Sequence, residues 1–364
     1  MSRVAIIGCG AISPRYAATL NQLGSVELVA VADGMAARAE ALAAESGATV
    51  MSVEEILADA TIDAVVNLTP PLAHGPVTRS ILEAGKAAFS EKPLAVDMAE
   101  GRALVDLATA QGVRFGCAPD TFLGTGLQLA RQAIDRGDIG TPLAANGFFL
   151  GCGAEYFLPN PNFFYERGGG PMLDMGPYYL TALVQLLGPA VAVSASGRIG
   201  RSQRPIMNGE RLGEMMDVSV LTHISSVVEF ANGPIATLVT SFDVAATDYR
   251  NIEIYGTEGT LSVPDPNYFE GVVRIKRVRE KEWTVLDPLV PTIPQQRGIG
   301  LADMMWAQRS GRAHRASAEV ALHVLDIMTS ALSSAELGHR LTLSTSCERA
   351  LPMDFSLAPN TFDD

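Results

Sequence analysis

The fold is decided by the stretch Arg3-Val4-Ala5-Ile6-Ile7-Gly8-Cys9-Gly10-Ala11-Ile12-Ser13-Pro14. Its apolar residues predict a short buried strand, its two glycines a tight turn, and Ser13-Pro14 the start of a helix. A glycine-rich turn between strand and helix lets backbone N–H groups approach a pyrophosphate at the helix N-terminus. The usual GxGxxG pattern is incomplete, because Ser13 stands where the third glycine would be.

A second apolar run, residues 26–32, ends on Asp33. A carboxylate that closes the second strand can bind both ribose hydroxyls of an adenosine and repels a 2′-phosphate, which favours NAD over NADP. Gly34 leaves space beside it and Arg38 lies one helical turn further on, so NADP stays an alternative. A surface turn with a positive φ explains the glycines alone. The complete order of strand, turn, helix, strand and acid predicts a dinucleotide-binding domain.

The composition is that of an ordinary globular protein with room for two domains: 364 residues, 48% hydrophobic and 18% charged. Glycine, proline or a charge interrupts the apolar runs, and no signal-peptide pattern is present, so we predict a cytoplasmic protein that does not contact a membrane. Four cysteines without a CxxC pair and five histidines without HxH or HExxH spacing predict no metal site. A net charge of −13 argues against a nucleic-acid partner.

Strands and helices alternate regularly from residue 1 to 120, which predicts a doubly wound parallel sheet with helices on both faces. Ligands on such a sheet bind beyond the carboxyl ends of the strands. Gly8, Asp33, Thr69 and Lys92 all lie at predicted strand ends of this kind. We therefore expect one domain at 1–120, with its site at this edge of the sheet.

Residues 121–364 show a different pattern and are predicted to form a second, α+β domain. Period-2 alternation predicts a large, mainly antiparallel sheet, with strands at 217–230, 235–242, Arg250–Tyr255, 260–263 and 272–277. Helices are predicted near 171–187, 301–310 and 317–337, and one face of the sheet is expected to be covered by helices. The other face is left open, and an open apolar face usually needs a partner. We expect a homodimer or homotetramer formed through this sheet.

A glycine-rich stretch from Gly168 to Tyr179 introduces the first of these helices. Asp174 and Tyr178 are four residues apart, so their side chains share one helix face, where they can hold a polyhydroxylated substrate and accept its proton. The alternative is a tightly packed helix in which Asp174 only complements the helix dipole. Aromatic and cationic residues just before it would line the substrate or cover an interface between domains: Tyr156, Phe157, Phe163, Phe164, Tyr165 and Arg167.

Taken together, these motifs resemble the glucose–fructose oxidoreductase/inositol dehydrogenase/MocA-like family of pyridine-nucleotide enzymes. The matching pieces are Gly8-Cys9-Gly10, Asp33, Thr69-Pro70-Pro71-Leu72-Ala73-His74, Glu91-Lys92-Pro93 and Gly168 to Tyr178. They span nearly the whole chain in the family's order. The resemblance implies a Rossmann domain, an open-faced sheet domain that mediates oligomers, and hydride transfer between a nicotinamide and a sugar, sugar derivative or cyclitol.

The resemblance also implies roles for single residues. It assigns the pyrophosphate to Gly8, Gly10, Ala11 and Ile12, the adenosine ribose to Asp33, and the flanks of the cofactor to Thr69, Pro70 and His74. Arg38, Glu91 and Lys92 complete the predicted cofactor site. Lys92 is also the expected catalytic lysine, since burial can lower the pKa of a lysine toward neutrality. The alternative for Lys92 is a solvated lysine at a strand end, paired with Glu91.

Tyr178 departs from the pattern of many family members, which have a histidine there as general base. A phenol has a pKa near 10 and needs a nearby cation such as Lys92 to act at neutral pH. Branches that resemble sugar or dihydrodiol oxidoreductases do use a tyrosine, so the departure argues only against a plain inositol dehydrogenase. Asp174 would then hold a substrate hydroxyl or orient Lys92.

Three functions fit these features. The first is an NAD(P)-dependent dehydrogenase or reductase that acts on a sugar, sugar acid or cyclitol. The second is an enzyme that keeps NAD bound and oxidises its substrate transiently, as in members that resemble oxidoreductive glycosidases. The third is a non-enzymatic sensor that binds a dinucleotide. Because a sensor needs no proton path, the presence of both Lys92 and Tyr178 favours an enzyme.

Overall fold

The computed structural model describes residues 1–249 and 251–363, and within it the chain forms two compact units. Unit 1 comprises Met1–Gln128, Leu289–Leu322 and Ala350–Asp364; unit 2 comprises Leu129–Pro288 and His323–Arg349. Two stretches from the second half of the chain thus belong with the N-terminal part. The division into domains at 1–120 and 121–364 stays a prediction.

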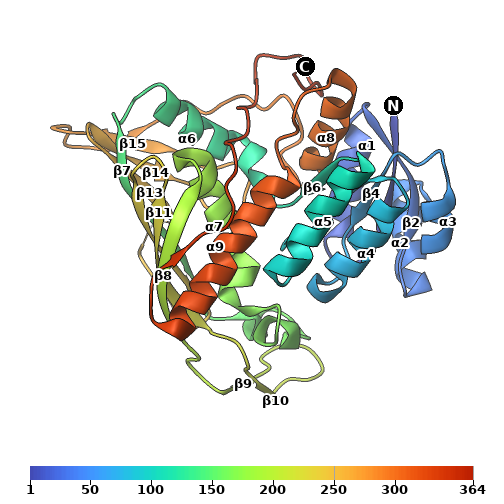
Figure 1. Cartoon of the computed structure of the whole chain (residues 1–364), viewed down its shortest axis with the longest axis horizontal. Helices are drawn as coiled ribbons and strands as arrows, with labels where there is room; N and C mark the ends of the chain where they lie inside the picture. Colours follow the sequence, from blue (N-terminus) through green and yellow to red (C-terminus); the bar gives the residue numbers. More distant parts are fainter. Residues whose placement is uncertain (250, 364) are drawn as a thin grey trace. The chain divides into compact units, whose positions relative to one another are not determined.

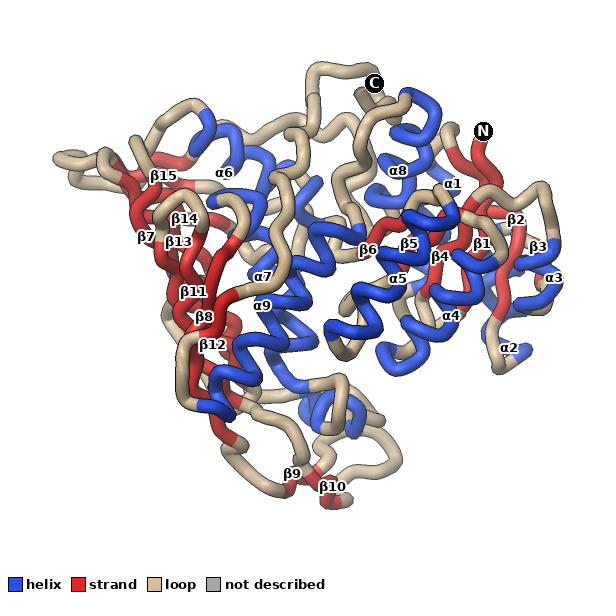
Figure 2. The backbone as a smooth tube through the Cα atoms, viewed as in Figure 1, coloured by secondary structure: helices blue, strands red, loops and turns tan. Residues whose placement is uncertain are grey.

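Unit 1 contains a six-stranded parallel sheet (Figure 1), with the strand order β3-β2-β1-β4-β5-β6 that can be followed in Figure 2. The order reverses between β1 and β4, which is the switch point where doubly wound sheets bind ligands. The predicted doubly wound sheet is confirmed. Its strands are β1 Ser2–Ile7, β2 Val26–Ala32, β3 Thr49–Val50, β4 Ala64–Asn67, β5 Ala87–Ser90 and β6 Phe115–Cys117.

The helices of unit 1 follow the local signals of the sequence. Ser52 and Glu55 form a capping box at the start of α3, and α2 ends at Gly47 with a φ of 80°. The helices are α1 Ser13–Gln22, α2 Ala36–Ser46, α3 Val53–Ala58, α4 Pro71–Glu83, α5 Met98–Gln111 and α8 Ile299–Ser310. Two further helices, α6 Thr125–Asp135 and α9 Ala318–Leu337, each begin in unit 1 and end in unit 2.

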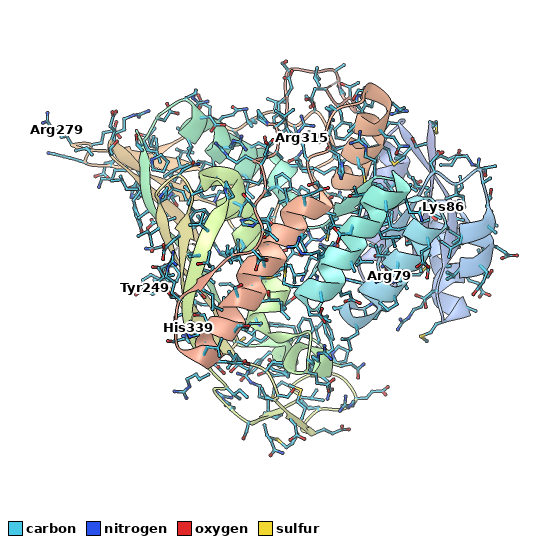
Figure 3. All side chains as sticks on the ribbon, in the orientation of Figure 1. Arg79, Lys86, Tyr249, Arg279, Arg315 and His339 are labelled. Carbon is cyan, nitrogen blue, oxygen red and sulfur yellow. The ribbon has the colours of Figure 1, made fainter. Side chains whose placement is uncertain are left out.

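The C-terminal tail is held to unit 1 by Arg315, which is labelled in Figure 3. This side chain is 1% exposed, and its guanidinium binds Asp303 at 2.5 Å and Asp363 at 2.6 Å. Its Nε also donates to the carbonyl oxygen of Leu351 at 2.9 Å. Since a buried guanidinium is stable only when paired, these contacts make the tail part of the packed structure of unit 1.

Unit 2 is built on a nine-stranded sheet in the order β16-β15-β14-β13-β7-β12-β11-β8-β17. All neighbouring strands are antiparallel except β7 and β12, so the predicted mainly antiparallel sheet is confirmed. Figure 2 shows α7 (Gly170–Leu187) and α9 along one side of these strands. The strands are β7 Pro142–Leu150, β8 Ala190–Arg198, β11 His223–Phe230, β12 Ile235–Ser241, β13 Ile252–Gly256, β14 Gly259–Val263, β15 Arg274–Arg277, β16 Thr284–Val285 and β17 Leu341–Thr342.

Some strand predictions for this unit need correction. The strand predicted at 217–230 is two, because β10 (Met215–Asp217) pairs with β9 (Gln203–Pro205) outside the large sheet, and β11 begins only at His223. β8 and β17 were not predicted from the sequence. The strand predicted at Arg250–Tyr255 is β13 from Ile252 onward, and Arg250 lies outside the described residues.

Helix α9 is, by length and composition alone, apolar enough to cross a membrane. The sequence analysis predicted the helix at 317–337 but not that it is long and apolar enough to pass this test. Buried core helices pass the same test, and 56% of the tested window of α9 is buried inside the structure.

Candidate active site

The turn at the carboxyl end of β1 has a backbone that only glycine fits at its first position. Gly8 has a φ of 100°, and a Cβ on it would lie 2.6 Å from the carbonyl carbon of Leu68. Its N–H donates to the carbonyl oxygen of Ala32 at 2.8 Å. The turn therefore lies against the ends of both β2 and β4, at the switch point of the sheet.

The start of α1 fits an anion. The helix has no side-chain cap, and Pro14 in its first turn has no N–H to donate. Ser13, which replaces the third glycine, donates from both its N–H and its hydroxyl to the carbonyl oxygen of Gly10, at 3.1 and 2.8 Å. The turn is thus closed by its own serine. The predicted pyrophosphate residues Gly8, Gly10, Ala11 and Ile12 all lie in this one turn and its junction with the helix.

Asp33 is held in place by the main chain at the end of β2. Its Oδ2 accepts from the N–H of Cys9 at 2.7 Å, and its Oδ1 accepts from the N–H of Met35 at 2.8 Å. Each oxygen keeps a further lone pair, as a ribose diol requires. The Cys9 thiol is no competing nucleophile, because burial and Asp33 raise its pKa to about 11. Arg38 is exposed in the first turn of α2.

Taken alone, unit 1 therefore fits a dinucleotide. A glycine cradle that a Cβ would fill, a helix N-terminus without a side-chain cap and an ordered carboxylate all lie at the carboxyl edge of the sheet.

A buried asparagine that the sequence interpretation did not single out organises the end of β4. The Oδ1 of Asn67 accepts from the hydroxyl of Thr69 at 2.6 Å, and its Nδ2 donates to the carbonyl oxygen of His74 and to Thr78, both at 3.0 Å. Pro70 is exposed at the start of α4. The available signal was a polar residue that ends an otherwise apolar strand directly before the Thr-Pro-Pro turn.

His74 is placed differently from what its predicted contact with a cofactor would need. It is 1% exposed, with Nδ1 2.8 Å from the carbonyl oxygen of Pro93 and Nε2 2.7 Å from that of Thr69. Burial lowers the pKa of His74, and the hydrogen bonds to the carbonyl oxygens of Pro93 and Thr69 oppose this shift. The ring thus joins the ends of β4 and β5, and its contact with a cofactor stays a prediction.

Lys92 follows β5 at the same edge of the sheet and is half-buried. Its N–H donates to Glu91 Oε2 at 2.9 Å, and the hydroxyl of Tyr16 donates to Glu91 Oε1 at 2.8 Å. Glu91 is 9% exposed, so its carboxylate serves the protein interior; a direct contact with the cofactor stays a prediction. Tyr16 was not predicted as a site residue, since the contact joins positions 75 residues apart.

In unit 2 the other predicted residues lie together on α7. Gly169 is required there, because a Cβ would lie 2.3 Å from the carbonyl oxygen of Phe163. The helix begins at Gly170, and the four-residue spacing places Asp174 and Tyr178 on one face. Asp174 is half-buried and Tyr178 is 5% exposed. Their catalytic roles stay predictions.

The aromatic segment before α7 divides into exposed and buried members. Tyr156, Phe157 and Phe163 are exposed, as the walls of a binding site would be. Tyr165 is fully buried in a cluster that includes Ile206, so it belongs to the core and lines no substrate site.

A buried ionic cluster surrounds Tyr165. The hydroxyl of Tyr165 donates to Glu155, which also accepts from Arg204 Nη1 at 2.5 Å, and Arg204 Nη2 donates to Asp243. Glu155 and Arg204 are each 1% exposed. The cluster joins the segment before α7 to Arg204 in β9 and to Asp243 just after β12, and nothing in the local sequence indicated it.

The fold and these residues define a dinucleotide-binding Rossmann unit combined with an open-faced sheet. Residues 2–118 match the family described as "Oxidoreductase family, NAD-binding Rossmann fold", and residues 127–262 match the GFO/IDH/MocA C-terminal domain. The chain belongs to the GFO/IDH/MocA oxidoreductase family and is an NAD-binding oxidoreductase. The predicted family, cofactor and class of enzyme are confirmed, and the matches support hydride transfer over the bound-cofactor and sensor alternatives.

Individual relatives agree with this family assignment. The chain is 30% identical over 269 residues to 1,5-anhydro-D-fructose reductase of Ensifer adhaerens, covering 72% of this chain and 75% of the relative. It is 30% identical over 265 residues to scyllo-inositol 2-dehydrogenase (NAD(+)) of Bacillus subtilis, covering 72% and 73%. A solved structure of levoglucosan dehydrogenase with NADH and L-sorbose has a TM-score of 0.81 at 20% identity, over 95% of this chain and 99% of that one. The last comparison speaks for the fold alone.

Proposed function

We propose that this protein oxidises a hydroxyl of a sugar, sugar derivative or cyclitol, or reduces the corresponding carbonyl, with NAD. The observation that carries this proposal is the place of Lys92, at the same sheet edge as Gly8 and Asp33 and tied by its own N–H to Glu91. The names of the two curated relatives, an anhydrofructose reductase and an inositol dehydrogenase, support the substrate class.

In the proposed reaction, bound NAD supplies the hydride acceptor. The Nζ of Lys92 stabilises Tyr178 as a phenolate, and the Oη of this phenolate takes the proton of the substrate hydroxyl and becomes a neutral phenol. Such a cation is needed, since the pKa of an ordinary phenol is near 10. Asp174 either holds a neighbouring substrate hydroxyl or orients Lys92.

The test is reduction of NAD and of NADP against a panel of aldoses, cyclitols and sugar acids, with Tyr178→Phe and Lys92→Ala in parallel. Loss of a positioned proton acceptor lowers turnover by about 10²–10⁴-fold. Wild-type turnover that survives in Lys92→Ala would contradict the assignment of Lys92. Absence of turnover in a wild type that binds NAD would favour the bound-cofactor or sensor function instead.

We further propose that a second copy of this chain covers the face of the nine-stranded sheet opposite α7. Exposed side chains on that face include Val227 and Ile235. Tyr249, which is labelled in Figure 3, stacks on Phe148 with ring centroids 4.8 Å apart. The proposed assembly is a homodimer or homotetramer. Val227→Lys should shift the mass measured by light scattering toward the monomer, and an unchanged mass would contradict this interface.

We also propose a boundary between domains and a location in the cell. A functional boundary near residue 120 is supported by the gap between the two family matches, at 2–118 and 127–262. A cytoplasmic location is supported by the cysteines, all four of which are free thiols.

A further inference from the structure

The backbone around Lys92 is held at three successive residues. The N–H of Glu91 donates to the carbonyl oxygen of Asn67 at 2.9 Å, and the N–H of Lys92 donates to Glu91 Oε2 at 2.9 Å. The carbonyl oxygen of Pro93 lies 2.8 Å from Nδ1 of His74. Two of these contacts fix the segment to β4 and α4, whereas the middle one depends on how the Glu91 carboxylate is itself held.

The Glu91 carboxylate is held by Tyr16. Its Oε1 accepts from the Tyr16 hydroxyl at 2.8 Å, and Tyr16 is fully buried on α1, one turn after Ser13. A buried carboxylate is stable only when its oxygens receive hydrogen bonds, so removal of one donor forces the carboxylate to move toward another. The contact therefore joins the helix that follows the pyrophosphate turn to the backbone of Lys92.

We propose that Tyr16 is a positioning residue for the reaction: through the Glu91 carboxylate it fixes the place of Lys92 relative to the N-terminus of α1. The inference rests on the proposed function, in which the Nζ of Lys92 stabilises the phenolate of Tyr178. A lysine whose backbone shifts by a fraction of an ångström no longer holds its Nζ where the reaction needs it, and misplacement of this kind costs turnover rather than cofactor binding.

The tyrosine suits this role because it stays a donor. Burial and the neighbouring carboxylates raise the pKa of Tyr16 well above its ordinary value, so its hydroxyl keeps its proton at any working pH. The charged groups that act on Tyr16 are Glu91, Asp120 and Arg297.

The first test compares Tyr16→Phe with the matched control Tyr165→Phe. Both tyrosines are fully buried and donate to a buried glutamate, but the second lies in the core of unit 2. We expect Tyr16→Phe to lower kcat about tenfold, with KM and the dissociation constant of NADH within about twofold of wild type. Tyr165→Phe should leave kcat within about twofold. Equal kcat values for the two variants would overturn the proposal.

A double-mutant cycle shows whether Tyr16 acts through Glu91. If it does, Tyr16→Phe/Glu91→Gln has the same kcat as Glu91→Gln alone, within about twofold. If the two losses multiply instead, Tyr16 acts by another route and the proposal fails. Glu91→Gln keeps the shape of the side chain, so it also serves if Tyr16→Phe does not fold.

A second measurement needs no substrate. The chain has only four lysines, Lys86, Lys92, Lys276 and Lys281, so reductive methylation with ¹³C-formaldehyde gives few NMR signals. The signal that is missing in Lys92→Arg identifies Lys92. We expect this signal to shift in Tyr16→Phe or Glu91→Gln and to stay in place in Tyr165→Phe. An unchanged signal in both variants would overturn the proposal.

The two proposals fail in different ways. If Lys92→Ala keeps wild-type turnover, the proposed function of Lys92 fails, and Tyr16 then positions no reacting group. If Lys92→Ala loses turnover while Tyr16→Phe keeps it, only the positioning role fails.

Discussion

The pairs Tyr16–Glu91 in unit 1 and Tyr165–Glu155 in unit 2 are the same chemical contact in two settings. In each, a fully buried tyrosine hydroxyl donates to a buried carboxylate. They differ in the third partner, which is the main-chain N–H of Lys92 in unit 1 and the guanidinium of Arg204 in unit 2. The first carboxylate holds a proposed catalytic residue, whereas the second neutralises a buried charge. The partner thus decides whether the same contact serves the reaction or the fold.

Removal of Arg204 should cause the largest loss of stability and tests the structural role of the pair in unit 2. Arg204→Met leaves the carboxylates of Glu155 and Asp243 without their cation, and breaking a buried ion pair in this way costs about 3–5 kcal/mol. Unfolding in urea measures this loss. The control is Arg340→Met, which removes a well-formed but exposed pair with Glu229 and should change stability little. If the two variants lose equal stability, the cluster in unit 2 does not depend on its arginine.

Asp120 provides a second contrast, because it lies near Tyr16 in unit 1 and has a poorly satisfied carboxylate. Its Oδ2 accepts from the N–H groups of Gly298 and Gly300, at 2.8 and 3.0 Å. Among the described residues its Oδ1 has no hydrogen-bond partner. Burial raises the pKa of Asp120 to about 6. Unit 1 therefore holds a buried acid whose charge depends on pH.

The raised pKa predicts a pH-dependent effect of Asp120→Asn. The folded protein binds this proton more tightly than the unfolded chain, so the stability it provides is complete below about pH 4 and is lost as pH rises through about 6. Asparagine keeps an oxygen that can accept from the N–H groups of Gly298 and Gly300, and it cannot ionise. Relative to the variant, the wild type should lose about 2 kcal/mol of unfolding free energy between pH 4 and 7.5.

Unfolding in urea at both pH values checks this prediction. The control Asp354→Asn should vary little between these pH values, since hydrogen bonds from Ser356 lower the pKa of exposed Asp354 and any change falls below about pH 4. A difference between wild type and Asp120→Asn that does not vary with pH would show that Asp120 stays ionised in the fold.

A substitution in unit 1 should be enough to change the preference for NAD over NADP. Asp33→Asn removes the negative charge that repels a 2′-phosphate and keeps an oxygen to accept from the main chain. We expect the ratio of kcat/KM for NADP to that for NAD to rise about tenfold, which equals about 1.4 kcal/mol. Glu40→Gln, an exposed change on α2, should leave the ratio unchanged. An unchanged ratio in Asp33→Asn would mean that other groups choose the cofactor.

The sequence predicted those parts of the site that depend on neighbouring residues. The turn from Gly8 to Ser13, Asp33 at the end of β2 and Lys92 at the end of β5 follow from strand and turn patterns. In a parallel sheet the strand ends share one edge, so order along the chain was enough to group them. The face shared by Asp174 and Tyr178 follows from helical spacing in the same way.

The contacts that support the site could not be predicted in this way. Tyr16 meets Glu91 across 75 residues, and Arg204 meets Glu155 across 49, so both pairs depend on how elements pack. Strand β8 was missed for a local reason. Its sequence, Ala-Val-Ala-Val-Ser-Ala-Ser-Gly-Arg, contains mostly small residues and gives weak alternation of polar and apolar side chains.

The smallest predicted effect is a departure from additivity, which tests whether the two tyrosine–glutamate pairs stabilise the protein independently. Tyr16→Phe and Tyr165→Phe each remove one hydrogen bond to a buried carboxylate and should each cost about 1–3 kcal/mol of unfolding free energy. The pairs share no residue and lie in different units, so the losses in the double variant should add within about 0.5 kcal/mol. Urea unfolding of the two single variants and the double variant measures this sum. A clear departure from additivity would show that the two carboxylates are coupled. The effect of the Tyr16–Glu91 pair on the reaction could then not be separated from the effect of the Tyr165–Glu155 pair on stability.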